Sequence, residues 1–399
     1  MDTESWVNKL DGGKIMLSLL GMTPISYLVA EYAPPVEQSA VGTALRCGCL
    51  LTLGGVALAL PVLARHHLPR NTLHTVGIAS MTGLYTISLC KELLFSGDRT
   101  PKPDSEPMPV TPSTTMPTTT TVKGSGTLMN TARRYLSHVW RLLAPVQVDV
   151  IHAAYERPPL SQRVTRALES AAWIGIKIVC APFVRHAYES MILHASSLDE
   201  SSLPPLRKLL LRGALAFLWF SQVACESYAM QVVDFLPLLS GGRIVGPSFL
   251  NYPFLATSVS NFWGSRYNQQ ISHFLRRTCC LASQANHPVN PAAYLLTVFA
   301  VSGLLHSYVS HCAFGRGQVS SFLFFLAHGA AIILERRISL FVNQPVYKCA
   351  FLWGVMLLTF PLYPGLYTNL EFVSHNPSSS FTRQLNQRLF PGLLVSAFP

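Results

Sequence analysis

Charged side chains are scarce in this sequence. Asp, Glu, Lys and Arg make up 12 % of the 399 residues, whereas hydrophobic residues make up 49 %. A soluble domain typically has roughly a quarter charged residues, so this chain has too little charge to cover a large soluble surface. The composition therefore predicts a membrane protein with several spans, and it argues against a long disordered chain or a soluble nucleic-acid-binding protein.

Signatures of metal and nucleotide sites are absent as well. The sequence contains no H-E-x-x-H motif, Walker A loop, EF-hand loop or G-x-S-x-G elbow. No pair of its nine cysteines has the spacing of a zinc ribbon. We therefore expect no metal and no bound cofactor. The net charge of +11 fits loops and span ends beside anionic lipid, so no nucleic-acid partner is expected.

Apolar segments long enough, or nearly long enough, to cross a bilayer recur along the chain. They cover residues 15–30, 41–64, 72–90, 209–233, 291–310, 320–334 and 348–369. A further segment, 168–184, contains Glu169 and Lys177, so it is either a functional span or a shallow one. The pattern predicts an all-α, polytopic transmembrane helical bundle of about eight spans.

One stretch between spans has the composition of a disordered loop. Residues 97–127 are rich in Pro, Thr and Ser and have almost no large apolar side chains to bury. The chain then divides into an N-terminal transmembrane group of about three spans (1–96), a Pro/Thr/Ser-rich disordered linker (97–135), middle transmembrane and amphipathic segments (136–240), a motif-rich region (241–375) and a polar C-terminal tail (376–399).

The charges of the loops give conflicting indications of topology. The basic loop after residue 64 predicts a cytoplasmic N-terminus, because short cytoplasmic loops carry an excess of Lys and Arg. Simple alternation would then put the basic-flanked linker on the opposite side. A missed or re-entrant segment around 136–152 would resolve this conflict, and the alternative stays open.

Two segments in the motif-rich region combine polar and aromatic residues. The first, F-W-G-S-R-Y-N at 262–268, continues as a basic amphipathic stretch typical of an interfacial helix. The second, V-F-A-V-S-G-L-L-H-S-Y, places His306 late in an apolar span. An ionisable residue inside a span is costly and indicates a functional site, although a neutral imidazole also serves as a structural core residue.

Together the two motifs resemble the wax-synthase-like branch of the membrane-bound O-acyltransferase superfamily. That branch has F-W-G-x-R-[WY]-[NH], followed by S-G-x-x-H in an apolar span. The resemblance covers about residues 240–340 and includes a later span that ends at Glu335. Ser265 and Ser307 stand where a second arginine and an acidic residue are common. The resemblance implies that 241–375 is the catalytic region.

The resemblance also implies a reaction, the transfer of an acyl group from acyl-CoA to an alcohol hydroxyl. His306 is the expected general base, because a neutral imidazole in a water-poor span accepts the alcohol proton as the oxygen attacks the thioester. Asn268 is expected to donate to the thioester carbonyl or to orient the substrate. Arg266 is expected to bind a CoA phosphate or, alternatively, to make a structural pair. The expected substrate- and CoA-binding residues are Arg266, Trp263, Tyr267 and Ser302.

The implied partners are acyl-CoA or acetyl-CoA as co-substrate, a lipophilic alcohol and the lipid bilayer. The implied location is the endoplasmic reticulum, where acyl-CoA and lipid alcohols meet. A long-chain alcohol that yields a wax ester is the leading acceptor, and a terpenoid or other secondary-metabolite hydroxyl acetylated from acetyl-CoA is the alternative. A membrane transporter would also explain the spans but not the two motifs. An inactive scaffold would explain the departures at Ser265 and Ser307.

Overall fold

The computed structural model describes residues 12–34, 36, 39–64, 73–94, 126–143, 149–150, 158–242, 244–246, 248–283, 290–338 and 344–363. These residues are overwhelmingly helical, which confirms the predicted all-α class. Strand β1 (Asp149–Val150) pairs antiparallel with β2 (Ile244–Val245), a contact of two residues on each side. Residues 97–125 of the predicted linker and the predicted polar tail, 376–399, lie outside the described residues.

Seven of the described helical segments are long and apolar enough to cross a membrane. They are α2 (Gly12–Tyr32), the continuous run α3 (Ala40–Cys49), η1 (Leu50–Gly54) and α4 (Gly55–Ala64), then α7 (Leu160–Ser197), α8 (Pro205–Glu226), α12 (Pro291–Phe314), α13 (Gln318–Arg337), and α15 (Pro345–Thr359) with η6 (Phe360–Leu362). The predicted segment 72–90 forms α5 (Leu73–Leu94), whose 22 residues extend about 33 Å. Counted with α5, the spans agree with the predicted bundle of about eight, and the chain is an integral, multi-pass membrane protein.

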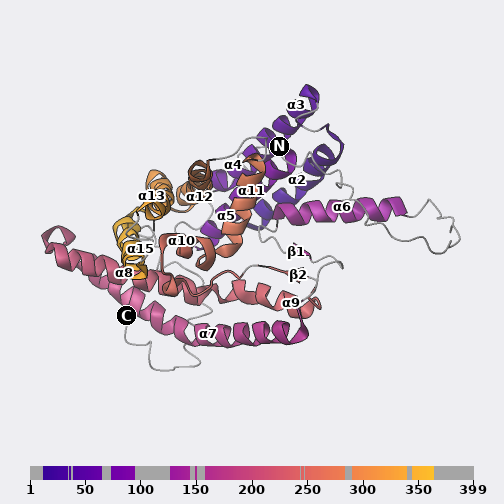
Figure 1. Cartoon of the computed structure of the whole chain (residues 1–399). Helices are drawn as coiled ribbons and strands as arrows, with labels where there is room; N and C mark the ends of the chain where they lie inside the picture. The colour runs from indigo at the N-terminus through magenta and orange to yellow at the C-terminus, as the bar shows by residue number, and fades with distance from the viewer. Residues whose placement is uncertain are drawn as a thin grey trace.

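Helix α7 is longer than the apolar segment that predicted it. The helix runs unbroken for 38 residues, about 57 Å, from Pro159 at its start to an extended residue, Leu198, after its end. The hydrocarbon core of a bilayer is about 30 Å thick, so α7 must tilt or continue into the headgroup region. It pairs with α8, and the two long helices lie together along the lower edge of the molecule in Figure 1.

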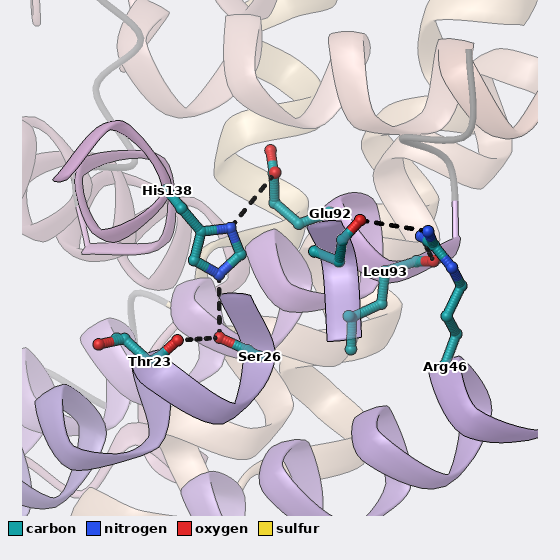
Figure 2. Close-up of polar contacts among 7 residues, drawn as sticks. Thr23, Ser26, Arg46, Glu92, Leu93 and His138 are labelled. Carbon is teal, nitrogen blue, oxygen red and sulfur yellow. Dashed lines mark hydrogen bonds and ion pairs between the residues drawn. The ribbon is translucent and has the colours of Figure 1, made fainter. Parts of the chain in front are cut away.

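Polar side chains are buried among the N-terminal helices. Helix α6 (Gly126–Leu143) places His138 between α2 and α5, where its Nε2 lies 2.9 Å from Ser26 Oγ and its Nδ1 lies 3.7 Å from Glu92 Oε2 (Figure 2). Ser26 already donates to the Thr23 carbonyl, so the histidine is the donor to Ser26. Residues 126–135 of the predicted linker are thus helical, and α6 buries His138 and Leu142 and bonds Tyr135 to Thr23 on α2.

A buried arginine joins the ends of two of these helices. Arg46 on α3 is 3 % exposed, and its guanidinium donates to the carbonyl of Leu93 in the last turn of α5 at 2.8 Å (Figure 2). It also donates to the carbonyls of Ala30, Ala33 and Pro34, at and just beyond the end of α2. Terminal carbonyls of a helix lack partners within the helix and carry partial negative charge. Arg46 supplies both the missing donors and the compensating charge.

The described part of the motif-rich region lies between the N-terminal helices and the α7–α8 pair (Figure 1). Its centre is the contact of α12 with α13, and α12 also packs against α5 and α11 (Gln269–Ser283). Gly303 on α12 is required for this contact, because a Cβ atom there would lie 3.0–3.2 Å from Phe322. Gly329 on α13 has the same role, since its Cβ would lie 3.1 Å from Phe299. The glycine of the S-G-x-x-H motif therefore sets how closely the two helices approach.

Candidate active site

The aromatic motif directly follows a short helix that is held by a carboxylate. Helix α10 (Val259–Asn261) leads directly into the π-helical turn η5 (Phe262–Arg266). Glu335, at the end of α13 and 5 % exposed, accepts hydrogen bonds through Oε2 from the backbone N–H groups of Val259 (2.8 Å) and Ser260 (3.2 Å). A negative charge at a helix N-terminus is favourable because the free N–H groups point toward it. Glu335 thereby fixes the aromatic motif to α13.

The structure places Arg266 in a local hydrogen-bond network. Its Nε donates to Asn261 Oδ1 at 2.7 Å, and its Nη1 donates to the carbonyls of Asn251 (3.3 Å) and Tyr252 (3.2 Å). The backbone N–H of Asn251 returns a hydrogen bond to the Arg266 carbonyl at 2.8 Å. Arg266 thus fastens the motif to the segment before it, and it is not among the residues that line the cavity described next.

A cavity of about 300 Å³ lies between η5, α11, α12 and α13. Its volume is at the lower end of the range of small-molecule sites. Five of the six predicted site residues line it: Trp263, Tyr267, Asn268, Ser302 and His306. The two sequence motifs, separated along the chain, therefore contribute to one cavity.

His306 lies against the aromatic wall of this cavity. Its ring stacks on Phe325, with ring centroids 4.3 Å apart and an angle of 9° between the planes, and it makes an edge contact with Tyr363 at 4.9 Å between centroids. Among the described residues its Nδ1 is buried and has no hydrogen-bond partner. Ser302 is one turn earlier on α12 and shares the same face. The ring is therefore held by stacking rather than by hydrogen bonds to this nitrogen.

Asn268 forms the turn between η5 and α11. Its φ of 43° is left-handed, a conformation that asparagine adopts more readily than most residues. The side-chain Oδ1 accepts a long hydrogen bond of 3.4 Å from the N–H of Ile271, in the first turn of α11. This contact engages the oxygen of the amide, which leaves the NH₂ group as the donor that can serve the cavity.

Trp263 and a second histidine lie side by side next to the cavity. The Trp263 ring makes edge contacts with Phe299 and His328, the latter at 5.4 Å between centroids, and a tilted contact with Phe325. His328 is fully buried on α13, and its Nδ1 donates to the Phe324 carbonyl at 2.8 Å. Within the described residues, Trp263 Nε1 and His328 Nε2 are both buried without a partner. Sequence reasoning did not single out His328, although its position in an apolar span was the available signal.

Two arginines that the sequence analysis did not select also line the cavity. Arg276 on α11 is exposed and donates from Nη2 to the Gly264 carbonyl (2.9 Å) and to Ser272 Oγ (3.0 Å). Arg336, at the end of α13, is exposed and lies 3.4 Å from Ser260 Oγ. Their exposure places two cations at the open side of a cavity that is lined largely by aromatic and aliphatic side chains. The basic amphipathic stretch after residue 268 was the signal for Arg276.

Acidic and metal-binding side chains do not gather in the part of the chain that the structure describes. No three His, Cys, Asp or Glu residues there lie close enough together to hold a metal ion. The chemistry that this cavity offers comes from an imidazole, a carboxamide, hydroxyl groups and two guanidinium groups.

Comparison with known proteins gives two similarities. Residues 246–327 match the family model described as "Membrane bound O-acyl transferase family". The chain is also 29 % identical over 126 residues to a "Long-chain-alcohol O-fatty-acyltransferase" of Simmondsia chinensis, an alignment that covers 30 % of this chain and 36 % of that protein. The chain thus matches about a third of the length of this curated relative. These matches confirm the resemblance to the wax-synthase-like branch of the membrane-bound O-acyltransferase superfamily.

Proposed function

We propose, on the premise that residues 246–327 resemble a membrane bound O-acyl transferase, that this protein transfers an acyl group from acyl-CoA to the hydroxyl of a lipophilic alcohol. The single observation that carries the proposal is that His306 and Asn268, from two separate motifs, line one cavity beside exposed cations. An acyl transfer of this kind needs a base, a donor for the thioester oxygen and an anchor for CoA phosphates.

His306 acts as the general base in this proposal. The alcohol oxygen attacks the thioester carbonyl carbon while one nitrogen of the imidazole takes the hydroxyl proton. The C–S bond then breaks, and the proton passes from the imidazolium to the departing CoA sulfur. Stacking on Phe325 and the edge contact with Tyr363 hold the ring in one orientation and keep water away, which limits hydrolysis of the thioester.

Asn268 stabilises the oxygen of the tetrahedral intermediate. Its Oδ1 is engaged by the N–H of Ile271, so the NH₂ group of the same amide is the donor for the developing oxyanion. The left-handed backbone at this residue and the Glu335 contact with α10 hold the turn in place before substrate arrives. Such preorganisation spares the enzyme the cost of ordering the donor during the reaction.

Arg276 and Arg336 bind the phosphates of CoA. Both line the cavity and are exposed, so they meet the polar part of a ligand whose acyl chain enters the aromatic interior. Arginine is suited to phosphate because its guanidinium presents several donors in one plane. Arg266 remains a predicted CoA ligand, and its bonds to Asn261 and to two backbone carbonyls favour the structural alternative.

A long-chain alcohol is the proposed acceptor, and the product is then a wax ester. The support is the similarity to the long-chain-alcohol O-fatty-acyltransferase of Simmondsia chinensis. We further propose the endoplasmic reticulum as the location, because acyl-CoA and lipid alcohols meet there. A terpenoid or other secondary-metabolite hydroxyl, acetylated from acetyl-CoA, is the alternative within the same chemistry.

Release of CoA from membranes that contain the protein tests the proposal directly. Membranes are incubated with labelled palmitoyl-CoA or acetyl-CoA, each with a fatty alcohol or a terpenoid alcohol. The proposal expects CoA release and a labelled ester that depend on the alcohol and are absent from membranes carrying His306→Ala. Ester formed only from acetyl-CoA would replace the wax-ester assignment by the acetyltransferase. No ester in any combination would favour a transporter or an inactive scaffold.

A further inference from the structure

A second cavity, of about 730 Å³, lies between α7, α8, the 3₁₀ helix η3 (Ser227–Phe235) and the segment 248–255. It shares no lining residue with the cavity that contains His306. Its volume is within the range of small-molecule and cofactor sites. The proposed acyl transfer uses none of its residues, so the ligand of this cavity is a separate question.

The deep side of this cavity is a satisfied ionic network. Asp234 is 3 % exposed and accepts hydrogen bonds from Arg166 (2.7 Å), Ser170 (3.1 Å) and Ser248 (2.6 Å). Arg166 also donates to the Gly246 carbonyl at 2.8 Å. The charges of Asp234 and Arg166 cancel, and this network ties α7 to η3 and to the following segment. This network therefore forms one fixed side of the cavity, and its net charge of zero gives no electrostatic attraction for a charged ligand.

One buried acceptor of the cavity has no donor. Gln231 is 7 % exposed, and within the described residues its Oε1 is buried without a hydrogen-bond partner. Leaving a buried acceptor unsatisfied costs about 1–3 kcal/mol, and such groups are rare in folded proteins. An occupant that brings an N–H or O–H group to Gln231 would remove this cost.

One wall of the cavity presents opposite charges on either side of an aromatic ring. Glu169, Trp173 and Lys177 occur at every fourth position of α7, so they share one face, and all three line the cavity. In the part of the chain that the structure describes, neither Glu169 nor Lys177 has an ion-pair partner within 4.0 Å. The Trp173 and Tyr252 rings make an edge contact with their centroids 5.1 Å apart. An unpaired acid and base on an apolar span indicate a functional site.

We propose that this cavity binds the headgroup of a zwitterionic phospholipid with a primary ammonium, of the phosphatidylethanolamine class. Lys177 pairs with the phosphate, and Glu169 and Gln231 Oε1 accept hydrogen bonds from the ammonium. The balance of one cation and one anion on this wall disfavours a purely anionic lipid. A quaternary ammonium has no N–H for Gln231, which disfavours a choline headgroup. The acyl chains then lie over the apolar part of the lining, formed by Ile176, Val184, Phe254 and Leu255.

Native mass spectrometry of the full-length protein in detergent tests this assignment. The protein is equilibrated with equal amounts of dioleoyl phosphatidylethanolamine, phosphatidylcholine and phosphatidylglycerol, and the lipids retained are counted. We expect phosphatidylethanolamine to be retained about tenfold better than the other two, the effect of one lost charge-assisted contact. Lys177→Met, Glu169→Gln and Gln231→Leu should each remove this preference, whereas Lys208→Met, at the start of α8 outside the cavity, should keep it.

Several outcomes would overturn the assignment. Equal retention of the three lipids by the wild-type protein would show that no selective headgroup site exists, and preference for phosphatidylglycerol would show an anion site. Glu169→Gln and Gln231→Leu leave Lys177 in place and keep side chains of similar size. An unchanged lipid preference in these two variants would contradict the proposed contacts, even if Lys177→Met did not fold. Full displacement by glycerophosphoethanolamine at equal concentration would mean that a soluble zwitterion is bound and not a lipid.

Discussion

The proposed chemistry depends on His306, whose imidazole ring stacks on Phe325. A general base contributes a factor of about 10²–10⁴ to such a reaction. His306→Ala should therefore lower kcat by at least about a hundredfold while the protein still inserts and folds, because the described contacts of the ring are with Phe325 and Tyr363. Turnover of palmitoyl-CoA with a fatty alcohol in purified membranes measures the change. His311→Ala, on the same helix but outside the cavity, is the matched control and should keep most of the activity.

Glu335 acts on the site through the backbone that it holds. Glu335→Ala removes the acceptor of two N–H groups, so we expect a loss of about 1–3 kcal/mol in the free energy of unfolding. Glu335→Gln keeps one acceptor oxygen and should lose less. Both variants should lower kcat more than they raise KM, because the turn that carries Asn268 loses its anchor. Thermal unfolding and steady-state kinetics on the same preparations measure the two effects.

An exposed ion pair provides the control for Glu335. Glu31 pairs with the exposed Arg134 on the surface of the N-terminal group, and exposed pairs contribute about 0–1 kcal/mol. Glu31→Ala should leave stability and kcat nearly unchanged. An equal loss in Glu31→Ala and Glu335→Ala would contradict a specific role for Glu335.

At the residue scale, five of the six residues predicted from the sequence line one cavity, but their contacts were not all predictable. The motif positions of Asn268 and His306 were sufficient to expect one site, and both line the same cavity. The partners of Arg266 depend on the carbonyls of residues 251 and 252, whose approach is a product of the folded chain and has no sequence pattern. That Arg336 lines the cavity also depends on how α13 packs in the folded chain, so only the structure revealed it.

Among the helices, the contact of α12 with α13 depends on a missing side chain. Gly303→Val places methyl groups where the backbone of Phe322 already lies at 3.1–3.2 Å from the Cβ position. The two helices must separate, and we expect a loss of about 1–3 kcal/mol in the free energy of unfolding, together with reduced activity. Gly354→Ala, on α15 with nothing within 4 Å of the added Cβ, should be neutral or slightly stabilising. Thermal unfolding of the two variants, measured side by side, tests the expectation.

The N-terminal helices depend in a similar way on Arg46. Replacement by Met keeps much of the apolar stem but removes the donors to four carbonyls, so Arg46→Met should destabilise the protein by about 2–4 kcal/mol. Arg134→Met removes an exposed guanidinium and should cost about 1 kcal/mol or less. Similar midpoints of thermal unfolding for the two variants would mean that Arg46 does not join the helix ends.

Hydropathy located the helices better than it located their ends. The apolar core of α7 was visible in the sequence, but the whole helix from Leu160 to Ser197 packs against α8 and η3, and these long-range contacts have no sequence pattern. Helix α6 was hidden because its buried face contains Tyr135 and His138, which hydropathy counts as polar. Both are accommodated by hydroxyl partners on α2, Thr23 and Ser26.

At the scale of the whole molecule, two different helices contribute to the proposed binding of acyl-CoA. Arg276 comes from α11 and Arg336 from α13, and removal of either should raise the KM for acyl-CoA several-fold with little change in kcat. Added salt should weaken acyl-CoA binding in the wild type more than in the double variant, because exposed charges are screened. Arg337→Met, the neighbouring arginine outside the cavity, is the control. An unchanged KM in the double variant would refute the assignment.

The turn at Asn268 is also a shared wall. Asn268 lines the cavity of His306, and the next residue, Gln269, lines the second cavity. The backbone near Asn268 is tied to the segment 249–252 on both sides of this residue, because the N–H of Gln269 donates to the Phe249 carbonyl and the N–H of Asn251 donates to the Arg266 carbonyl. A ligand that shifts this turn in one cavity therefore also shifts a wall of the other cavity. Thermodynamic reciprocity then requires that, if a ligand of the second cavity changes the affinity for acyl-CoA by some factor, acyl-CoA changes the affinity for that ligand by the same factor.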